Sequence, residues 1–267
     1  MNYVYIILFI IVLLFIYMHF EAKWVQIKRV DFTKSSKGLK ILHLSDIHIN
    51  MLRVPVEKTR RIIKKEKPDI IIISGDFIEK PVDASRFLDY LQTIKQSYKV
   101  YLCMGNHDYQ AYTHNPAGVE TFIREIEAIK ATVLRNSSVL IEKNASRYNL
   151  IGIDDLREGY PNIDEAMKGC LPADANIVLT HNPDLALELY GRKIDYLFCG
   201  HFHGGQIWMP FNLEFFLLRK DKLCRHGMKR GLHKLNGINI YISRGLGNVV
   251  VPLRFISRPE ITVYTIP

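Results

Sequence analysis

The chain has 267 residues, which is enough for one domain of roughly 150–250 residues and a short appendage. Hydrophobic residues make up 48% and charged residues 24%, a composition that excludes disordered, collagenous and coiled-coil chains. The formal net charge of +9 favours an anionic partner, either nucleic acid, a phosphorylated metabolite or an acidic membrane surface. The four cysteines form no C-x-x-C pair, so neither a zinc ribbon nor a disulfide framework is indicated.

The chain begins with an uninterrupted apolar segment. Residues 1–20 contain no Asp, Glu, Lys or Arg, and residues 3–18 are all apolar or aromatic. A helix of about 20 such residues spans a bilayer. A secretory signal would have a basic residue before this segment, and aromatic residues such as Tyr3, Tyr17 and Trp24 mark both ends in the manner of a membrane interface. The sequence therefore predicts an uncleaved transmembrane anchor over residues 1–22, in contact with the lipid bilayer.

Basic residues follow the predicted anchor, and they predict its orientation. They are Lys23, Lys28, Arg29, Lys34, Lys37 and Lys40. The positive-inside rule then places the rest of the chain on the cytoplasmic face of the cell membrane, although short anchors of surface enzymes sometimes export their domains. We expect a single pass, a basic juxtamembrane linker with the first strand over residues 23–38, and one catalytic domain over residues 39–267.

The region after residue 38 alternates short Ile/Val/Leu-rich runs with stretches of helical period, which is typical of an α/β architecture. Helices are expected over residues 56–65, 84–95 and 118–130. Five of the apolar runs end in side chains that can bind metal. These are Asp46 and His48, then Asp76, then Asn106, His107 and Asp108, then His181, and finally His201 and His203. Because ligands of an open α/β sheet bind at the carboxyl ends of its strands, these scattered ends can converge.

The local sequence around these residues supports a metal site. Asp46 and His48 are two positions apart, so in extended backbone they project to one side. Gly75, Gly105 and Gly200 each stand immediately before a candidate ligand, where the absence of Cβ lets backbone approach a crowded centre. Oxygen and nitrogen donors without a thiolate suit Mn²⁺, Fe or Zn²⁺ and disfavour a structural Cys-type zinc site.

The motifs stand in the order D-x-H at 46–48, G-D at 75–76, G-N-H-D at 105–108, His181, and G-H-x-H at 200–203. This set resembles the calcineurin-like metallophosphoesterase family. The later segments 203–206, 229–231 and 243–247 look like a membrane-associated bacterial subgroup that includes UDP-2,3-diacylglucosamine pyrophosphatase-like enzymes. The resemblance implies an α/β fold, a calcineurin-like four-layer αββα sandwich, that follows the N-terminal transmembrane helix in the chain. The family often continues G-D as G-D-x-x-D, and here Glu79 takes the last position, a conservative departure that leaves the ligands intact.

The resemblance also implies the cofactors and the residue roles. It implies two divalent metal ions, with Mn²⁺ favoured and Fe or Zn²⁺ as alternatives. One ion is assigned to Asp46, His48 and His203, the other to Asn106, His181 and His201, with Asp76 as the bridge. The implied nucleophile is a metal-bridging hydroxide. His107 is assigned to protonating the leaving oxygen, and Asp108 to orienting or charging the His107 ring.

Together these features predict a dimetal-dependent phosphoester hydrolase at the membrane. The expected substrate is a phosphorylated, amphiphilic small molecule, a lipid-linked or nucleotide-linked phosphodiester or pyrophosphate. A nuclease-type phosphodiesterase stays open, because the same kind of centre cleaves DNA and the positive charge would aid binding. Much of that charge is juxtamembrane, however, which points to lipid headgroups, so we expect no obligate nucleic-acid partner. A non-catalytic membrane adaptor is the alternative from another class.

The metal motifs leave residues 207–218 unexplained. This segment is apolar and aromatic, and it is too short to span a bilayer. A basic cluster follows it, made of Arg219, Lys220, Lys222, Arg225, Lys229 and Arg230. Such a sequence is typical of an interfacial element that enters the headgroup layer. It equally suits a core element with a solvated charged end, and the sequence leaves the two interpretations open.

Overall fold

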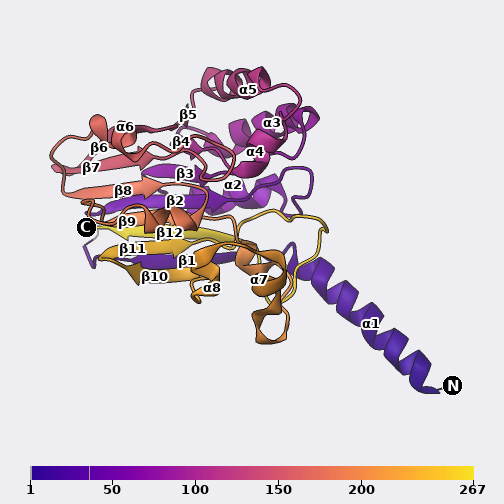
Figure 1. Cartoon of the computed structure of the whole chain (residues 1–267). Coiled ribbons are helices and arrows are strands. Elements are labelled where there is room, and N and C mark those ends of the chain that lie inside the picture. Colours follow the sequence, from indigo (N-terminus) through magenta and orange to yellow (C-terminus); the bar gives the residue numbers. More distant parts are fainter. Residues whose placement is uncertain (1, 36) are drawn as a thin grey trace.

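The computed structural model describes residues 2–35 and 37–267 of the chain. Two six-stranded sheets lie face to face at the centre, helices cover their outer faces, and one helix projects away from the domain (Figure 1). The first sheet has the order β1-β12-β2-β3-β4-β5 and the second β10-β11-β9-β8-β7-β6. Both sheets contain parallel and antiparallel pairs. The α/β class predicted from the alternating pattern is confirmed.

The strands of the first sheet are β1 (Gln26–Asp31), β2 (Leu39–Ser45), β3 (Ile70–Ser74), β4 (Lys99–Cys103), β5 (Thr132–Val133) and β12 (Glu260–Ile266). Those of the second are β6 (Ser137–Lys143), β7 (Ser146–Gly152), β8 (Ala175–Leu179), β9 (Tyr196–Cys199), β10 (Gly231–Leu235) and β11 (Ile238–Ile242). The helices are α1 (Asn2–Glu21), α2 (Val56–Glu66), α3 (Ala84–Lys95), α4 (Asn106–Gln110), α5 (Ala117–Ala128), α6 (Ile163–Lys168), α7 (Leu213–Leu218) and α8 (Lys222–Arg225). Short 3₁₀ turns lie at η1 (Pro81–Asp83), η2 (Pro183–Leu187), η3 (His203–Gly205) and η4 (Pro210–Asn212).

Three apolar clusters separate four layers of structure. Alternate residues of β2 face opposite ways, since Leu42 and Leu44 pack toward α2, α3 and α5, whereas Leu39 and Ile41 pack between the two sheets. A third cluster joins the outer face of the second sheet to α6, η2, α7 and α8. The predicted four-layer αββα sandwich is therefore confirmed. The expected helices are found as α2, α3 and α5, with ends that differ by at most two residues.

Helix α1 has the length and composition of a membrane span, but its last turn belongs to the domain. Its mean hydropathy is 2.5, and residues 3–17 are exposed. Met18, Glu21 and Ala22 are buried against the domain. The Glu21 carboxylate accepts the backbone N–H groups of Ile256 and Ser257 at 3.0 and 2.9 Å. The chain then enters β1, which pairs in parallel with β12.

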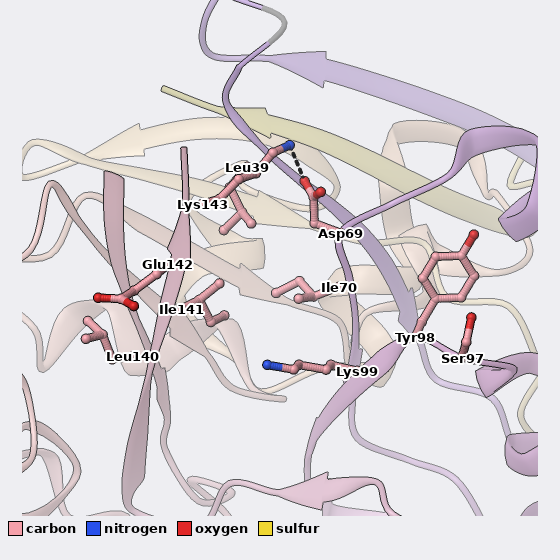
Figure 2. A pocket seen from close by; sticks show the side chains of 10 residues that line it. All are labelled: Leu39, Asp69, Ile70, Ser97, Tyr98, Lys99, Leu140, Ile141, Glu142 and Lys143. Carbon is pink, nitrogen blue, oxygen red and sulfur yellow. Dashed lines mark hydrogen bonds and ion pairs between the residues drawn. The ribbon is translucent and has the colours of Figure 1, made fainter. Parts of the chain in front are cut away.

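A cavity of about 600 Å³ lies at the amino ends of β2, β3 and β4. Figure 2 shows its lining, in which Ile70 and Ile141 are apolar and the Lys143 ammonium is paired with Asp69 at 2.6 Å. The predicted metal ligands follow the carboxyl ends of the same strands, so this cavity is at the opposite end of the sheet. In the described part of the chain, none of the residues that line it belongs to a group able to hold a metal ion.

Candidate dimetal site

The predicted metal ligands converge at one end of the two sheets. β2, β3 and β4 run in parallel, as do β7, β8 and β9, so the loops that follow them leave from the same edge. These loops carry all seven predicted ligands, and each of the seven is buried, with at most 4% of its surface exposed. The seven are Asp46, His48, Asp76, Asn106, His181, His201 and His203. Burial of so many polar side chains is unfavourable unless each has a partner.

The side chains form two groups that share one carboxylate. Ligand atoms of Asp46, His48, Asp76 and His203 lie within 4.8 Å of one another, and so do those of Asp76, His181 and His201. Asp76 thus stands where a bridge between two ions is needed. Asn106 is buried, and its Oδ1 has no hydrogen-bond partner among the described residues. That oxygen is free to accept a cation.

The histidine rings are oriented by partners outside the centre. His48 directs Nδ1 to Glu79 Oε1 at 2.6 Å, and His181 directs Nδ1 to the Ser74 carbonyl at 2.9 Å. Since both partners are acceptors, Nδ1 of each ring carries a hydrogen and Nε2 faces the centre. Such partners fix the tautomer and raise the basicity of metal-binding histidines.

The nitrogen atoms that face one another fit metal ions between them. His48 Nε2 lies 3.2 Å from His203 Nε2, and His181 Nε2 lies 3.1 Å from His201 Nδ1. Lone pairs at this separation repel unless a proton or a cation lies between them. Nitrogen and carboxylate donors around a shared Asp76 suit divalent transition metals. The residues present therefore fit a pair of divalent ions.

Burial and neighbouring carboxylates set the protonation of the histidines in the centre. Burial lowers the pKa of His201 to about 3 and that of His203 well below its usual value, so both rings are neutral and able to bind metal. Burial also opposes a charge on His181, but the carboxylates of Asp76, Asp46 and Asp155, with Asp76 the largest contributor, together outweigh it and raise the pKa of His181 to about 10. Without a cation, a proton occupies this position, so metal binding must release it.

Backbone geometry is unusual throughout the centre. Five predicted ligands have φ between 39° and 72°, in the left-handed region that residues with a Cβ rarely adopt: Asp46, His48, Asp76, His201 and His203. Such strain concentrates at functional sites. The close approach predicted for the glycines is confirmed, because a Cβ on Gly105 would lie 2.3 Å from Asp76 Oδ1 and one on Gly200 would lie 2.2 Å from Asp46 Oδ2.

His107 lies at the edge of the centre and is held by Glu79. Its Nδ1 is 2.9 Å from Glu79 Oε2, and its backbone N–H donates to Asp76 Oδ1 at 2.9 Å. Burial opposes a charge on the ring, but the bond to Glu79 together with the charges of Asp76 and Glu79 outweighs it and raises the pKa of His107 to about 9. The ring therefore carries a proton at neutral pH. One carboxylate, Glu79, connects His107 to the predicted ligand His48.

Asp108 does not contact the His107 ring, as its predicted role requires, but binds backbone N–H groups. The Asp108 carboxylate accepts four backbone N–H groups at 2.7–3.1 Å, those of Asp76, Phe77, Ile78 and Gly105. It therefore fastens the loop after β3 to the loop after β4 and positions Asp76, while Glu79 occupies the place beside the His107 ring. The sequence carries a signal for this role, because Glu79 stands at the last position of the G-D-x-x-D pattern.

Two further residues reach the centre without a sequence signal. His201 Nε2 lies 3.5 Å from Asp221 Oδ1 and 3.4 Å from Arg219 Nη1. Asp221 is itself paired with Arg157 at 2.6 Å. In the sequence Arg219 is one member of a basic cluster, and Asp221 belongs to none of the motifs. An Arg guanidinium beside the ligands is suited to bind phosphoryl oxygens.

The centre opens into a second cavity, of about 530 Å³, whose lining is mostly apolar. His107, His203 and Arg219 lie at the polar part of its wall. Its apolar part includes Ile207, Met209, Phe202, Phe215 and Val249, Val250 and Val251. A phosphate at the metal ligands could thus carry an apolar group that extends into this cavity.

Comparison with known proteins agrees with this geometry. Residues 39–205 match the family Calcineurin-like phosphoesterase, and the chain belongs to this family of metallophosphoesterases. It is 35% identical over 249 residues to the uncharacterized metallophosphoesterase YkoQ of Bacillus subtilis, which covers 92% of this chain and 90% of that protein. It is 31% identical to the phosphodiesterase YaeI of Escherichia coli, over 92% of this chain and 90% of that protein. The chain is accordingly a hydrolase that acts on phosphoesters.

A vertebrate relative has a membrane-related name. The chain is 29% identical to the transmembrane protein with metallophosphoesterase domain of Danio rerio, over 89% of this chain and 55% of that protein. The shared part corresponds to most of the present chain, which is about half of the longer relative.

Proposed function

We propose that this protein hydrolyses phosphodiester or pyrophosphate bonds in amphiphilic small molecules, lipid-linked or nucleotide-linked, at the membrane surface. The observation that carries the proposal is the pair of ligand groups that share Asp76, beside His107 and an apolar cavity. Two divalent metal ions, Mn²⁺ in the first place and Fe or Zn²⁺ otherwise, would supply an activated water and neutralise the phosphoryl oxygens.

The residue roles follow from their positions. We assign Asp46, His48 and His203 to one ion and Asn106, His181 and His201 to the other, with Asp76 shared. His107 donates a proton to the leaving oxygen, and Glu79 holds its ring in the protonated form. Arg219, at 3.4 Å from His201, binds a phosphoryl oxygen. Proton donation by a positioned histidine accelerates such reactions by about 10²–10⁴-fold.

The proposed location is a single-pass position in the cell membrane, with the catalytic domain on the cytoplasmic face. The length and hydropathy of α1 support a span, and the basic residues after it support this orientation. Removal of α1 as a signal peptide would also remove the buried Glu21, whose carboxylate accepts two backbone N–H groups of the domain. This contact favours an α1 that is retained.

The chemistry is tested with the full chain in nanodiscs, loaded with Mn²⁺. We expect metal-dependent hydrolysis of bis(p-nitrophenyl) phosphate. His107→Ala should retain its metal but lose about 10²–10⁴-fold on substrates with poor leaving groups, and lose less on activated aryl esters. An equal loss on both kinds of substrate would show that His107 positions phosphate and does not supply a proton.

The substrate class is tested with a panel. Nucleotide-linked lipids, isoprenoid pyrophosphates, phospholipids and DNA are each incubated with the metal-loaded protein, and products are followed by mass spectrometry. Turnover of the amphiphilic compounds supports the proposal. Turnover of DNA alone would identify a nuclease, and no metal-dependent turnover of any compound would favour the adaptor.

A further inference from the structure

Five large apolar side chains, each at least 47% exposed, lie on segments that line or adjoin the apolar cavity. We call them the apolar rim: Phe211, Phe216, Leu217, Val250 and Ile256, with exposed fractions of 86%, 55%, 71%, 88% and 47%. Three segments contribute them, η4 with α7, the loop around residue 250, and the loop around residue 256. Clustered exposed apolar groups mark a surface that binds another apolar phase or molecule.

Hydrogen bonds through Gln206 hold the three segments together. The Gln206 amide donates to the carbonyl oxygens of Val249 and Val251, both at 2.9 Å. Its backbone carbonyl accepts the N–H of Phe255 at 2.9 Å, and the N–H of Trp208 donates to the Phe255 carbonyl at 3.0 Å. The segments that carry the apolar rim are therefore connected through Gln206, which stands three positions after the predicted ligand His203.

The backbone holds rim side chains outward at an energetic cost. Val250 and Ile256 have φ of 63° and 54°, a conformation that is rare for β-branched residues, and Phe211 has φ of 59°. Each is unfavourable in conformation as well as in its exposure to water. Phe215, the neighbour of the exposed Phe216, is buried and packs on Phe202. The core interpretation of residues 207–218 thus holds for Phe215, whereas Phe216 and Leu217 are exposed.

The apolar rim is continuous with the root of α1. The Tyr17 and Phe255 rings meet edge to face with their centroids 6.0 Å apart, and the backbone N–H of Arg254 donates to the Met18 carbonyl at 3.2 Å. Glu21 accepts the N–H of the rim residue Ile256 itself. Figure 1 shows α7 and the loop between β11 and β12 beside the end of α1 that meets the domain. The rim and the end of α1 that meets the domain are consequently parts of one continuous surface.

Positive charge accompanies the apolar groups. Lys220, Lys222 and Arg225 are exposed directly after α7. The Lys229 ammonium lies 5.1 Å from the ring centroid of Phe215 and 5.7 Å from that of Phe216. Apolar side chains that enter the acyl boundary, with cations at the headgroup level, are what an interfacial surface needs to bind anionic lipid.

We infer that the apolar rim docks into the headgroup layer of the anionic bilayer that α1 enters. Continuity with α1 selects the bilayer as the occupant, and the adjacent cations select anionic lipid. The docked rim turns the mouth of the apolar cavity toward the lipid, so amphiphilic substrates reach the metal ligands without crossing water. This inference deepens the proposed function and rests on it for the substrate, but the docking itself can be measured separately.

Docking is tested on the full chain, because α1 contributes buried residues to the domain. Leu217→Cys and, as matched control, Tyr190→Cys are made with Cys170→Ser, since the other three native cysteines are buried. Tyr190 is 76% exposed and lies on the connection that leads to the amino end of β9, away from the mouth. Each protein carries an environment-sensitive fluorophore at the new cysteine and is placed, one copy per nanodisc, in anionic or zwitterionic lipid.

The readout is quenching by a lipid with a nitroxide near the headgroup and by aqueous iodide. We expect the nitroxide lipid to quench the label at position 217 at least about twofold more than that at position 190, and more strongly in anionic lipid. Equal nitroxide quenching at the two positions overturns the inference. Protection from iodide at position 217 without nitroxide quenching also overturns it, because a protein contact would then cover the rim.

Activity provides a second arm. Phe216→Ser with Leu217→Ser, compared with Tyr190→Ser, should leave hydrolysis of soluble bis(p-nitrophenyl) phosphate unchanged and reduce turnover of a vesicle-embedded phosphodiester lipid about tenfold. Unchanged turnover of the embedded lipid overturns the role of the rim. If the wild-type protein hydrolyses neither substrate, the proposed function fails, whereas the quenching result still decides whether the rim docks.

Discussion

Replacement of Glu79 by alanine tests the arrangement in which one carboxylate serves two histidines. Glu79 accepts from His48 at 2.6 Å and from His107 at 2.9 Å. Burial opposes its charge, but the bonds to His107 and His48 outweigh burial and lower the pKa of Glu79 to about 2. It is therefore ionised at neutral pH, and both hydrogen bonds are charge-assisted.

The expected loss follows from these two bonds. A hydrogen bond to a charged group contributes about 1.5–3 kcal/mol, which corresponds to about 10- to 150-fold in rate if the bond to His107 is lost in the transition state. Loss of the bond to His48 should weaken metal binding by about 10–100-fold. Glu79→Asp gives the G-D-x-x-D pattern its usual aspartate. The Asp side chain is one methylene shorter than Glu and should reach only one of the two rings, so we expect a loss of activity between those of wild type and Glu79→Ala.

The assay separates the two effects. Metal content is measured by mass spectrometry, and kcat is measured at saturating Mn²⁺ on a diester with an aryl leaving group and on one with an alkyl leaving group. We expect a larger fall on the alkyl ester, because only that leaving group needs the proton of His107. Glu57→Gln, a substitution at an exposed surface carboxylate, is the control. If Glu79→Ala, at full metal occupancy, hydrolyses the alkyl ester with the same kcat as the wild-type protein, this reasoning is refuted.

Three further outcomes are expected. Asp76→Asn should abolish hydrolysis and lower the metal stoichiometry, since an amide is a poor bridge between cations; near-normal turnover with two ions bound would remove Asp76 from that role. Arg219→Ala should raise KM for phosphodiesters about tenfold, with partial recovery in Arg219→Lys, whereas Lys220→Ala should have no effect; equal effects at positions 219 and 220 would contradict a phosphate contact. Glu66→Gln should lower the free energy of unfolding by about 1 kcal/mol at pH 7, because burial raises the Glu66 pKa but Arg29 and Lys40 together outweigh it and keep that pKa below its usual value. That stabilisation is present above about pH 4.3 and disappears as the pH falls through the lowered pKa, so a difference in Tm that persists at low pH would speak against the ion pair.

Local chemistry made much of the fold and the centre predictable. Five of the strands are apolar runs of the right length, and the candidate ligands lie just after them, so the general rule about carboxyl ends of parallel strands brought Asp46, Asp76 and His181 together. The helices were predictable for the same reason, because their apolar period is a property of neighbouring residues. The apolar length of α1 likewise needs no tertiary information.

Contacts between side chains on different loops were decided by the tertiary structure alone. In the sequence Asp108 adjoins His107 and Glu79 belongs to a different motif. Only the packing of the loop after β3 on the loop after β4 directs Asp108 to backbone N–H groups and Glu79 to the ring. Arg219 reaches His201 because the chain turns back after α7, and one charge in a basic cluster cannot be distinguished from its neighbours by composition.

The division of residues 207–218 shows the same limit of sequence information. Phe215 and Phe216 are adjacent and chemically identical, yet one is buried and the other is exposed. In a helix of six residues the direction of each side chain depends on how that helix docks, and here it docks through Phe215 on Phe202. The sequence determined that an apolar segment follows the metal ligand His203. The fold determined which of its side chains build the core and which form the rim, because burial depends on the position of neighbours that are distant along the chain.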